Sequence, residues 1–150
     1  MTKDVMLTTR GMQFAFNEQT GEGENIEIIT AATYYERGNH KYLVYEEILE
    51  GVDEPISNMV KFSKDSIEVT KKGLINVHMV FETGKQNLTS YHTPFGNLMI
   101  GINTKNVQVT ESENHIHLEA SYGLDINYEF LSECQICMDI TPKNNLHLIS

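Results

Sequence analysis

The sequence has few basic residues and no long apolar run. Its 150 residues include 11 Lys and Arg against 21 Asp and Glu, which gives a formal net charge of −10 at pH 7. This charge repels the phosphate backbone of nucleic acids and an anionic membrane surface, and the basic residues form no block. No window approaches the roughly 20 apolar residues of a membrane-spanning helix, and the N-terminus lacks an apolar segment of signal-peptide length. We therefore expect a cytoplasmic protein that binds neither nucleic acid nor membrane.

Motifs of the common catalytic sites are also missing. The sequence contains no G-x-S-x-G elbow, no GxxxxGK[ST] phosphate-binding loop and no GxGxxG fingerprint. The one glycine-rich turn, TGEGEN at 20–25, carries two glutamates, which would repel a phosphate group. We predict no catalytic residue and no cofactor.

Cysteine is rare, with only Cys134 and Cys137 in the stretch ECQIC. A C-x-x-C redox or zinc site needs both sulfur atoms on one side of a helix start or a tight knuckle, and zinc needs a second pair of ligands. The surrounding residues alternate as in a strand, where side chains three positions apart point to opposite faces. We therefore expect two reduced thiols that do not form one site.

Apolar and polar residues alternate along most of the chain, which is the pattern of β-strands. Turn-forming residues interrupt the alternation at short intervals. Residues 44–51 favour a helix in composition, but the segment is short and lacks an N-cap, so a strand is predicted there too. The predicted strands are 26–35, 42–48, 59–62, 66–69, 74–81, 87–90, 97–102, 107–109, 115–120 and 127–140.

These strands predict an all-β fold in one domain that covers residues 1–150, because no linker or repeat divides the chain. Every loop is too short for a parallel crossover, so the strands should pair antiparallel. A sandwich and a barrel both fit this rhythm, and closure into a barrel removes the exposed sheet edges. We predict a single antiparallel β-barrel of about 8–11 strands.

Four segments, taken in order, are similar to one family. YYERGNHKYLVYEE, KKGLINVHMVFETG, SYHTPFGNLMIGINT and LEASYGLDIN resemble the pattern of DUF1934, a bacterial family of unknown function, over roughly residues 26–140. The resemblance implies a calycin-like β-barrel, similar in architecture to lipocalins and fatty-acid-binding proteins. It brings no known activity, substrate or catalytic residue. The chain departs from the family at Lys71, where an Arg is usual, so a role that needs a bidentate guanidinium is not expected.

The sharpest motif, YHTPFG, allows two interpretations. Pro94 fixes its own backbone and extends Thr93, and Gly96 supplies the freedom for a tight turn. In the favoured interpretation, the motif is a hairpin or corner whose Phe95 plugs one end of the barrel, with Tyr91 packed below it. In the other, the same corner forms the rim of a ligand cavity.

Glu47 also allows two interpretations, which differ in the face of its strand that points inward. If Leu43 and Tyr45 face the interior, Glu47 does so as well, because side chains alternate along a strand. Glu47 would then be a buried acid that needs a partner, and Lys71, Tyr45 or Tyr91 could supply it.

In the second interpretation Tyr42 and Val44 face inward, and both Glu46 and Glu47 are largely solvated. Neither set of side chains is clearly the more apolar. This second interpretation is the slightly preferred one for a single sequence.

Three classes of function are compatible with this barrel. The first is the binding of a small apolar or amphipathic molecule, because a barrel of eight or more strands can enclose a cavity. The second is protein interaction or self-association, including a homodimer, by a barrel with a filled core. The third is an enzyme with a site at the barrel mouth. The predicted ligand-binding residues are Tyr45, Glu47, Lys71, Tyr91 and Phe95. The enzyme site would use the same residues except Phe95.

Two histidines have a spacing that suits a metal ion. His115 and His117 are two residues apart and should project from the same strand face. A third ligand is not evident from the sequence. We therefore predict no metal site.

Overall fold

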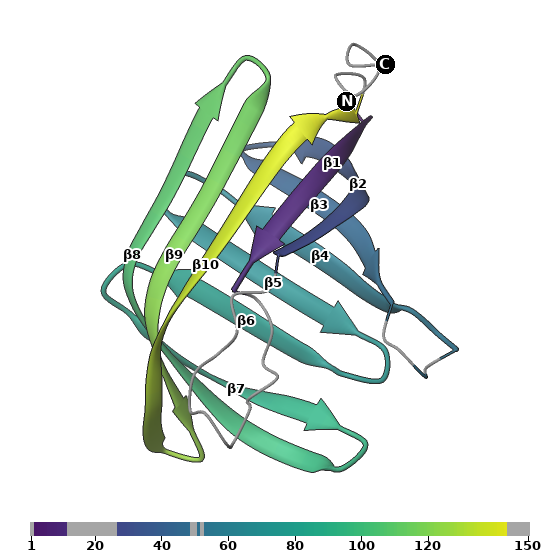
Figure 1. The fold of residues 1–150 in the computed structure, drawn as a ribbon. Coiled ribbons are helices and arrows are strands. Elements are labelled where there is room, and N and C mark those ends of the chain that lie inside the picture. Colours follow the sequence, from purple (N-terminus) through teal and green to yellow (C-terminus); the bar gives the residue numbers. More distant parts are fainter. Residues whose placement is uncertain (1, 12–26, 49–50, 52, 144–150) are drawn as a thin grey trace.

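The chain folds into ten antiparallel β-strands (Figure 1). A computed structural model describes residues 2–11, 27–48, 51 and 53–143. The strands are β1 (Thr2–Arg10), β2 (Glu27–Arg37), β3 (His40–Glu47), β4 (Ile56–Phe62), β5 (Ser66–Lys72), β6 (Val77–Glu82), β7 (Gln86–Thr93), β8 (Gly96–Ser112), β9 (His115–Ile126) and β10 (Glu129–Pro142). Among the described residues, no helix has the length and apolar composition that crossing a lipid bilayer requires.

The strands form one sheet that curls into a nearly closed barrel. Their order is β6-β5-β4-β3-β2-β1-β10-β9-β8-β7, so every strand pairs with its neighbour along the chain except β6 with β7, and β1 pairs with β10. The two edge strands approach each other where the Asn76 backbone exchanges hydrogen bonds of 3.0 and 2.9 Å with His92. The Asn87 side chain adds a 3.2 Å hydrogen bond to the carbonyl of Val80. The predicted antiparallel barrel is confirmed, because these contacts join the two edges of the sheet.

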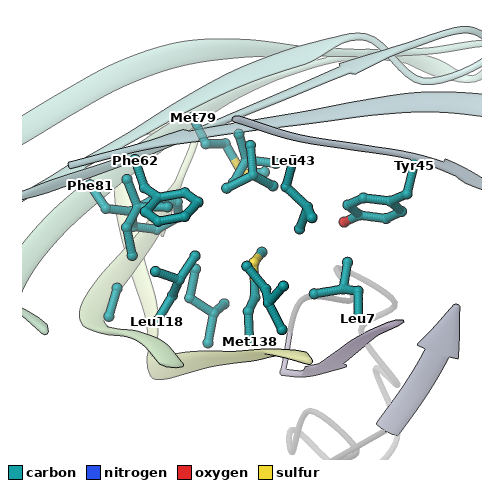
Figure 2. Packing of buried hydrophobic residues seen from close by; sticks show 14 of the residues in the cluster. Leu7, Leu43, Tyr45, Phe62, Met79, Phe81, Leu118 and Met138 are labelled. Atoms are coloured by element: carbon teal, nitrogen blue, oxygen red, sulfur yellow. The ribbon is translucent and has the colours of Figure 1, made fainter. Parts of the chain in front are cut away.

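The core is built from alternate residues of the strands. On β4, Ile56, Val60 and Phe62 are buried, whereas Ser57 and Met59 between them are exposed. Figure 2 shows side chains from two walls of the barrel meeting in its interior. One wall contributes Leu43, Tyr45, Phe62, Met79 and Phe81, and the other contributes Leu7, Leu118 and Met138. Because both walls are apolar, their contact removes a large area from water and stabilises the fold.

The strands run between two ends of the barrel. We name the end at which β3, β5 and β7 finish the Glu47 end, and the end at which β3 starts the Lys41 end. The turns after β5, β7 and β9 lie at the Glu47 end. The β8–β9 turn lies at the Lys41 end and is seen at the top left of Figure 1.

Apart from shifted strand ends, the structure differs from the predicted strands at two places. Residues 97–102 and 107–109 belong to the single 17-residue strand β8, because the intervening NTKN segment forms a bulge between Thr104 and Asn106 rather than a turn. Strand β1 was not predicted, since its inner face carries only two apolar residues, Val5 and Leu7. The segment 42–48 is confirmed as a strand by β3. The predicted turn at 20–25 lies outside the described residues.

Candidate functional site

Polar side chains gather inside the barrel at the Glu47 end. The register places Tyr45 of β3 opposite Asn58 of β4, and Asn58 opposite Lys71 of β5. The three side chains therefore form one row on the inner face of the sheet. Glu47 lies two residues beyond Tyr45 and shares this face, because side chains alternate along a strand. The inner face of β3 thus changes from apolar to acidic at the end of the barrel.

The ammonium group of Lys71 lies at the centre of these polar groups. Its Nζ donates hydrogen bonds to Glu47 Oε1 at 2.7 Å and to Asn58 Oδ1 at 2.8 Å. Asn58 Nδ2 donates to Glu47 Oε1 at 3.3 Å and to the carbonyl of Ile56 at 3.2 Å. The Lys71 side chain is 8% exposed and that of Glu47 is 22% exposed. Lys71 needs these partners, because an unpaired charge is costly to remove from water.

Two tyrosines complete the site. Burial, together with the charge of Glu47, raises the pKa of Tyr45 above its usual range, and the same two causes raise the pKa of Tyr91. Both phenols stay protonated at neutral pH and can donate a hydrogen bond. We name Tyr45, Glu47, Asn58, Lys71 and Tyr91 the Lys71 cluster.

The slightly preferred interpretation of β3 is wrong. Leu43 and Tyr45 are buried in the core, so they and Glu47 face the interior. Tyr42 instead stacks on Tyr35 of β2, with ring centroids 4.9 Å apart. The sequence alone could not decide this, because apolar residues occur in both phases of the strand.

The structure brings together four of the five predicted ligand-binding residues, namely Tyr45, Glu47, Lys71 and Tyr91. Lys71 is the partner of Glu47, and it is one of the three partners that the first interpretation offered. These four are also the residues of the predicted enzyme site. Whether they bind a ligand stays a prediction.

The fifth residue, Phe95, lies away from this cluster. The motif does form a hairpin turn, in which Thr93 Oγ1 donates a 2.8 Å hydrogen bond to the carbonyl of Gly96 and accepts one of 3.2 Å from the Phe95 amide. Phe95 is 99% exposed, so the prediction that it plugs the barrel is wrong. The reason is that the turn lies beyond the last paired residues, where no opposite strand faces the Phe95 ring.

Asn58 was missed by the sequence analysis. The predicted strand began at Met59, one residue after it. A signal was nevertheless present, since Asn58 has the same phase as the core residues Val60 and Phe62. A polar residue in phase with a buried apolar face needs a partner inside the fold.

The opposite end of the barrel is hollowed. Two cavities of about 200 and 340 Å³ both border on Lys41 and Glu111. An ion pair joins these two side chains, and it spans the mouth, because β3 and β8 are not neighbours in the sheet. The smaller cavity also has apolar lining residues, including Val5, Ile116 and Ile140. No sequence pattern indicates this pair, since its members are 70 residues apart in the chain.

A third set of polar residues lies on the outer face of β9 and β10. His115 Nε2 and His117 Nδ1 each lie 2.7 Å from the same oxygen of Asp139, Oδ1. The prediction of no metal site assumed that the two histidines lack a third ligand. That assumption is wrong, because the register of β9 and β10 pairs His117 with Asp139.

The thiols behave as predicted within the described residues. Cys134 packs against the core, whereas Cys137 points outward, with its Sγ 3.8 Å from Glu119 Oε1. Both are free. They lie on opposite faces of β10, so they do not form one site.

Comparisons with known proteins agree with this fold. The family model described as "Domain of unknown function (DUF1934)" matches residues 12–138. The chain is 29% identical over 130 residues to the "Uncharacterized beta-barrel protein YwiB" of Bacillus subtilis (strain 168). This alignment covers 87% of this chain and 89% of that protein. The crystal structure of the ywiB protein from Bacillus subtilis superimposes with a TM-score of 0.72 at 21% identity, covering 93% of this chain and 90% of that one. The structural likeness shows the shared fold.

Proposed function

The chain belongs to the DUF1934 family, and the YwiB protein of Bacillus subtilis has the same β-barrel fold. On this basis we propose that the chain binds a small amphipathic molecule inside the barrel. The observation that carries the proposal is the Lys71 ammonium group, which is held inside an apolar barrel by Glu47 and Asn58. Convergent polar groups in an apolar surround are the usual composition of a small-molecule site. The calycin-like character of the barrel, with a ligand held between its walls, is part of the same proposal.

The Lys71 cluster favours a neutral, hydroxyl-bearing head group. Lys71 and Glu47 balance each other's charge, so a charged head group would leave one charge uncompensated in a poorly solvated place. A hydroxyl group can donate to Glu47 and accept from the Tyr45 phenol or from Lys71. The apolar body of the ligand would then extend along the core-facing side chains.

This function predicts the effect of Glu47→Gln on binding. Titration of glycerol monooctanoate, a neutral amphiphile with hydroxyl groups, should show saturable binding to the wild-type protein by calorimetry. Glu47→Gln should lower the affinity about tenfold, because a hydrogen bond to a charged acceptor is stronger than one to a neutral amide. Circular dichroism should show that the variant keeps its fold.

Glu111→Gln is the matched control, since it makes the same chemical change at the Lys41 end. It should leave the affinity unchanged. A loss in Glu111→Gln with none in Glu47→Gln would move the ligand to the cavities of the Lys41 end and overturn the assignment to the Lys71 cluster. Absence of binding, together with a native mass spectrum that shows no bound small molecule after gentle purification from the natural host, would reject the function itself.

A second candidate function is self-association through the apolar turns at the Glu47 end. Phe95 of the β7–β8 turn is almost fully exposed, and Tyr128 and Phe130 at the β9–β10 turn are also exposed. The β9–β10 turn lies beside the start of β8, because Asn127 exchanges hydrogen bonds with the Met99 backbone at 2.7 and 3.0 Å. Exposed apolar groups at one end of the barrel favour contact with a second copy of the chain.

Sedimentation velocity tests this second candidate. The wild-type protein should form a dimer, and the double substitution Phe95→Ser with Phe130→Ser should return it to a monomer, because it removes two aromatic side chains from the contact. Met59→Ser, at an exposed apolar position on the outer face of β4, should leave the dimer intact. A wild-type monomer at high concentration would exclude a homodimer through these turns.

The proposal also places the protein in the cytoplasm. It is supported by the two free thiols of Cys134 and Cys137, since reduced cysteines are usual in that compartment. Loss of the protein from the cytosolic fraction on cell fractionation would contradict it.

A further inference from the structure

Five side chains able to bind metal ions follow one another across the outer face of β9 and β10. His115, His117 and Glu119 alternate along β9 and therefore project to the same side. The register places Asp139 opposite His117 and Cys137 opposite Glu119. None of these residues belongs to the Lys71 cluster, which lies inside the barrel.

Three ligand atoms of this set converge on one point. His115 Nε2 and His117 Nδ1 both approach Asp139 Oδ1 to 2.7 Å, and the ligand atoms of the three residues all lie within 4.8 Å of one another. Ligand atoms bound at about 2.0 Å to a tetrahedral zinc ion are about 3.3 Å apart. The two contacts between a histidine nitrogen and Asp139 Oδ1 would therefore need to lengthen by only about 0.6 Å, which small rotations of exposed or half-exposed side chains can supply.

Glu119 lies where it can orient the second histidine. His117 directs Nδ1 toward Asp139, while its other ring nitrogen, Nε2, is 3.9 Å from Glu119 Oε2. Histidines that bind metal ions usually donate their second ring N–H to a carboxylate, which fixes the orientation and tautomer of the ring. At 3.9 Å Glu119 does not yet accept this hydrogen bond, but it lies beside the ring nitrogen that a supporting carboxylate of a metal site would bind.

From this geometry we propose that His115 Nε2, His117 Nδ1 and the Asp139 carboxylate bind a divalent transition-metal ion, represented by zinc. Two imidazoles and one carboxylate suit zinc and its neighbours, whereas calcium and magnesium prefer an all-oxygen set. The His115 side chain is 47% exposed, so water can reach the ion and fill its remaining position.

The ion would lie at the rim of the Lys41 end. His115 also borders the cavity of about 200 Å³ at that mouth. The proposed metal site is therefore far along the strands from the Lys71 cluster. It does not depend on the proposed ligand binding, and either can fail without the other.

Calorimetric titration of zinc chloride into the metal-free, untagged full-length protein tests the proposal. We expect one zinc ion per chain. His117→Ala and His115→Ala should each lower the zinc affinity at least about a hundredfold, because loss of a direct ligand costs no less than the 10–100-fold loss that follows removal of a supporting group. Calcium chloride should give no binding.

His78→Ala is the matched control, because it removes an exposed histidine from the different strand β6; it should bind zinc as the wild-type protein does. Thermal unfolding followed by circular dichroism shows that each variant is folded before it is titrated. Absence of saturable zinc binding in the wild-type protein would overturn the proposal. A zinc affinity of His117→Ala equal to that of the wild-type protein would also overturn it. So would a loss of zinc affinity in Cys137→Ser with none in His115→Ala, because the ion would then have other ligands.

Discussion

Replacement of Phe81 by alanine is expected to lower the free energy of unfolding by about 3–5 kcal/mol. Phe81 lies on β6 and is only 1% exposed. Its ring packs edge-on against Tyr122 of β9, with centroids 4.9 Å apart and an interplanar angle of 64°. The substitution removes the apolar surface of a whole ring and leaves a cavity between two walls of the barrel, and both effects destabilise the folded state.

Phe95→Ala provides the matched control for this prediction, since the chemical change is identical and only the environment differs. Phe95 is 99% exposed, so its truncation should change the free energy of unfolding by less than about 0.5 kcal/mol. Urea unfolding followed by far-ultraviolet circular dichroism measures both values by linear extrapolation. Similar losses in the two variants would show that Phe95 packs inside the barrel after all and that the placement of its turn is incorrect.

The contrast between these phenylalanines shows what an alternating pattern determines. Phe81 is in phase with Val77 and Met79 on β6, and all three are buried. A period of two assigns such residues to one face, and the apolar face of a strand turns inward. Phe95 lies in a turn, where no periodicity exists, so its direction depends on how the turn ends the hairpin.

The candidate site was predictable only in part for a similar reason. Residue types offered Lys71, Tyr45 and Tyr91 as partners of a buried Glu47, but β3 has apolar residues in both phases, and its inward face is set by pairing with β2 and β4. The outer cluster needed the register of β9 with β10, which places Asp139 beside His117 although the two are 22 residues apart. Registers arise from the packing of the whole sheet, and a local pattern does not contain them.

Removal of Glu47 should lower the free energy of unfolding more than removal of Lys71 does. Glu47→Ala leaves the Lys71 ammonium group, with its 8% exposed side chain, without an anionic partner. The expected loss of unfolding free energy is about 3–5 kcal/mol, the usual cost of breaking a buried ion pair from one side. Lys71→Met leaves instead the Glu47 carboxylate, whose side chain is 22% exposed. Water can reach this group, so a smaller loss of about 1–3 kcal/mol is expected.

The double variant Glu47→Leu with Lys71→Met separates stability from binding. It removes both charges at once, and apolar replacement of a buried ion pair is often neutral or stabilising, so it should unfold at a higher urea concentration than Glu47→Ala. If the pair is present to bind a head group, the same double variant should fold well and yet lose its affinity for glycerol monooctanoate. A loss below about 1 kcal/mol in Glu47→Ala would instead mark the pair as an ordinary solvated one, and its burial would no longer support ligand binding.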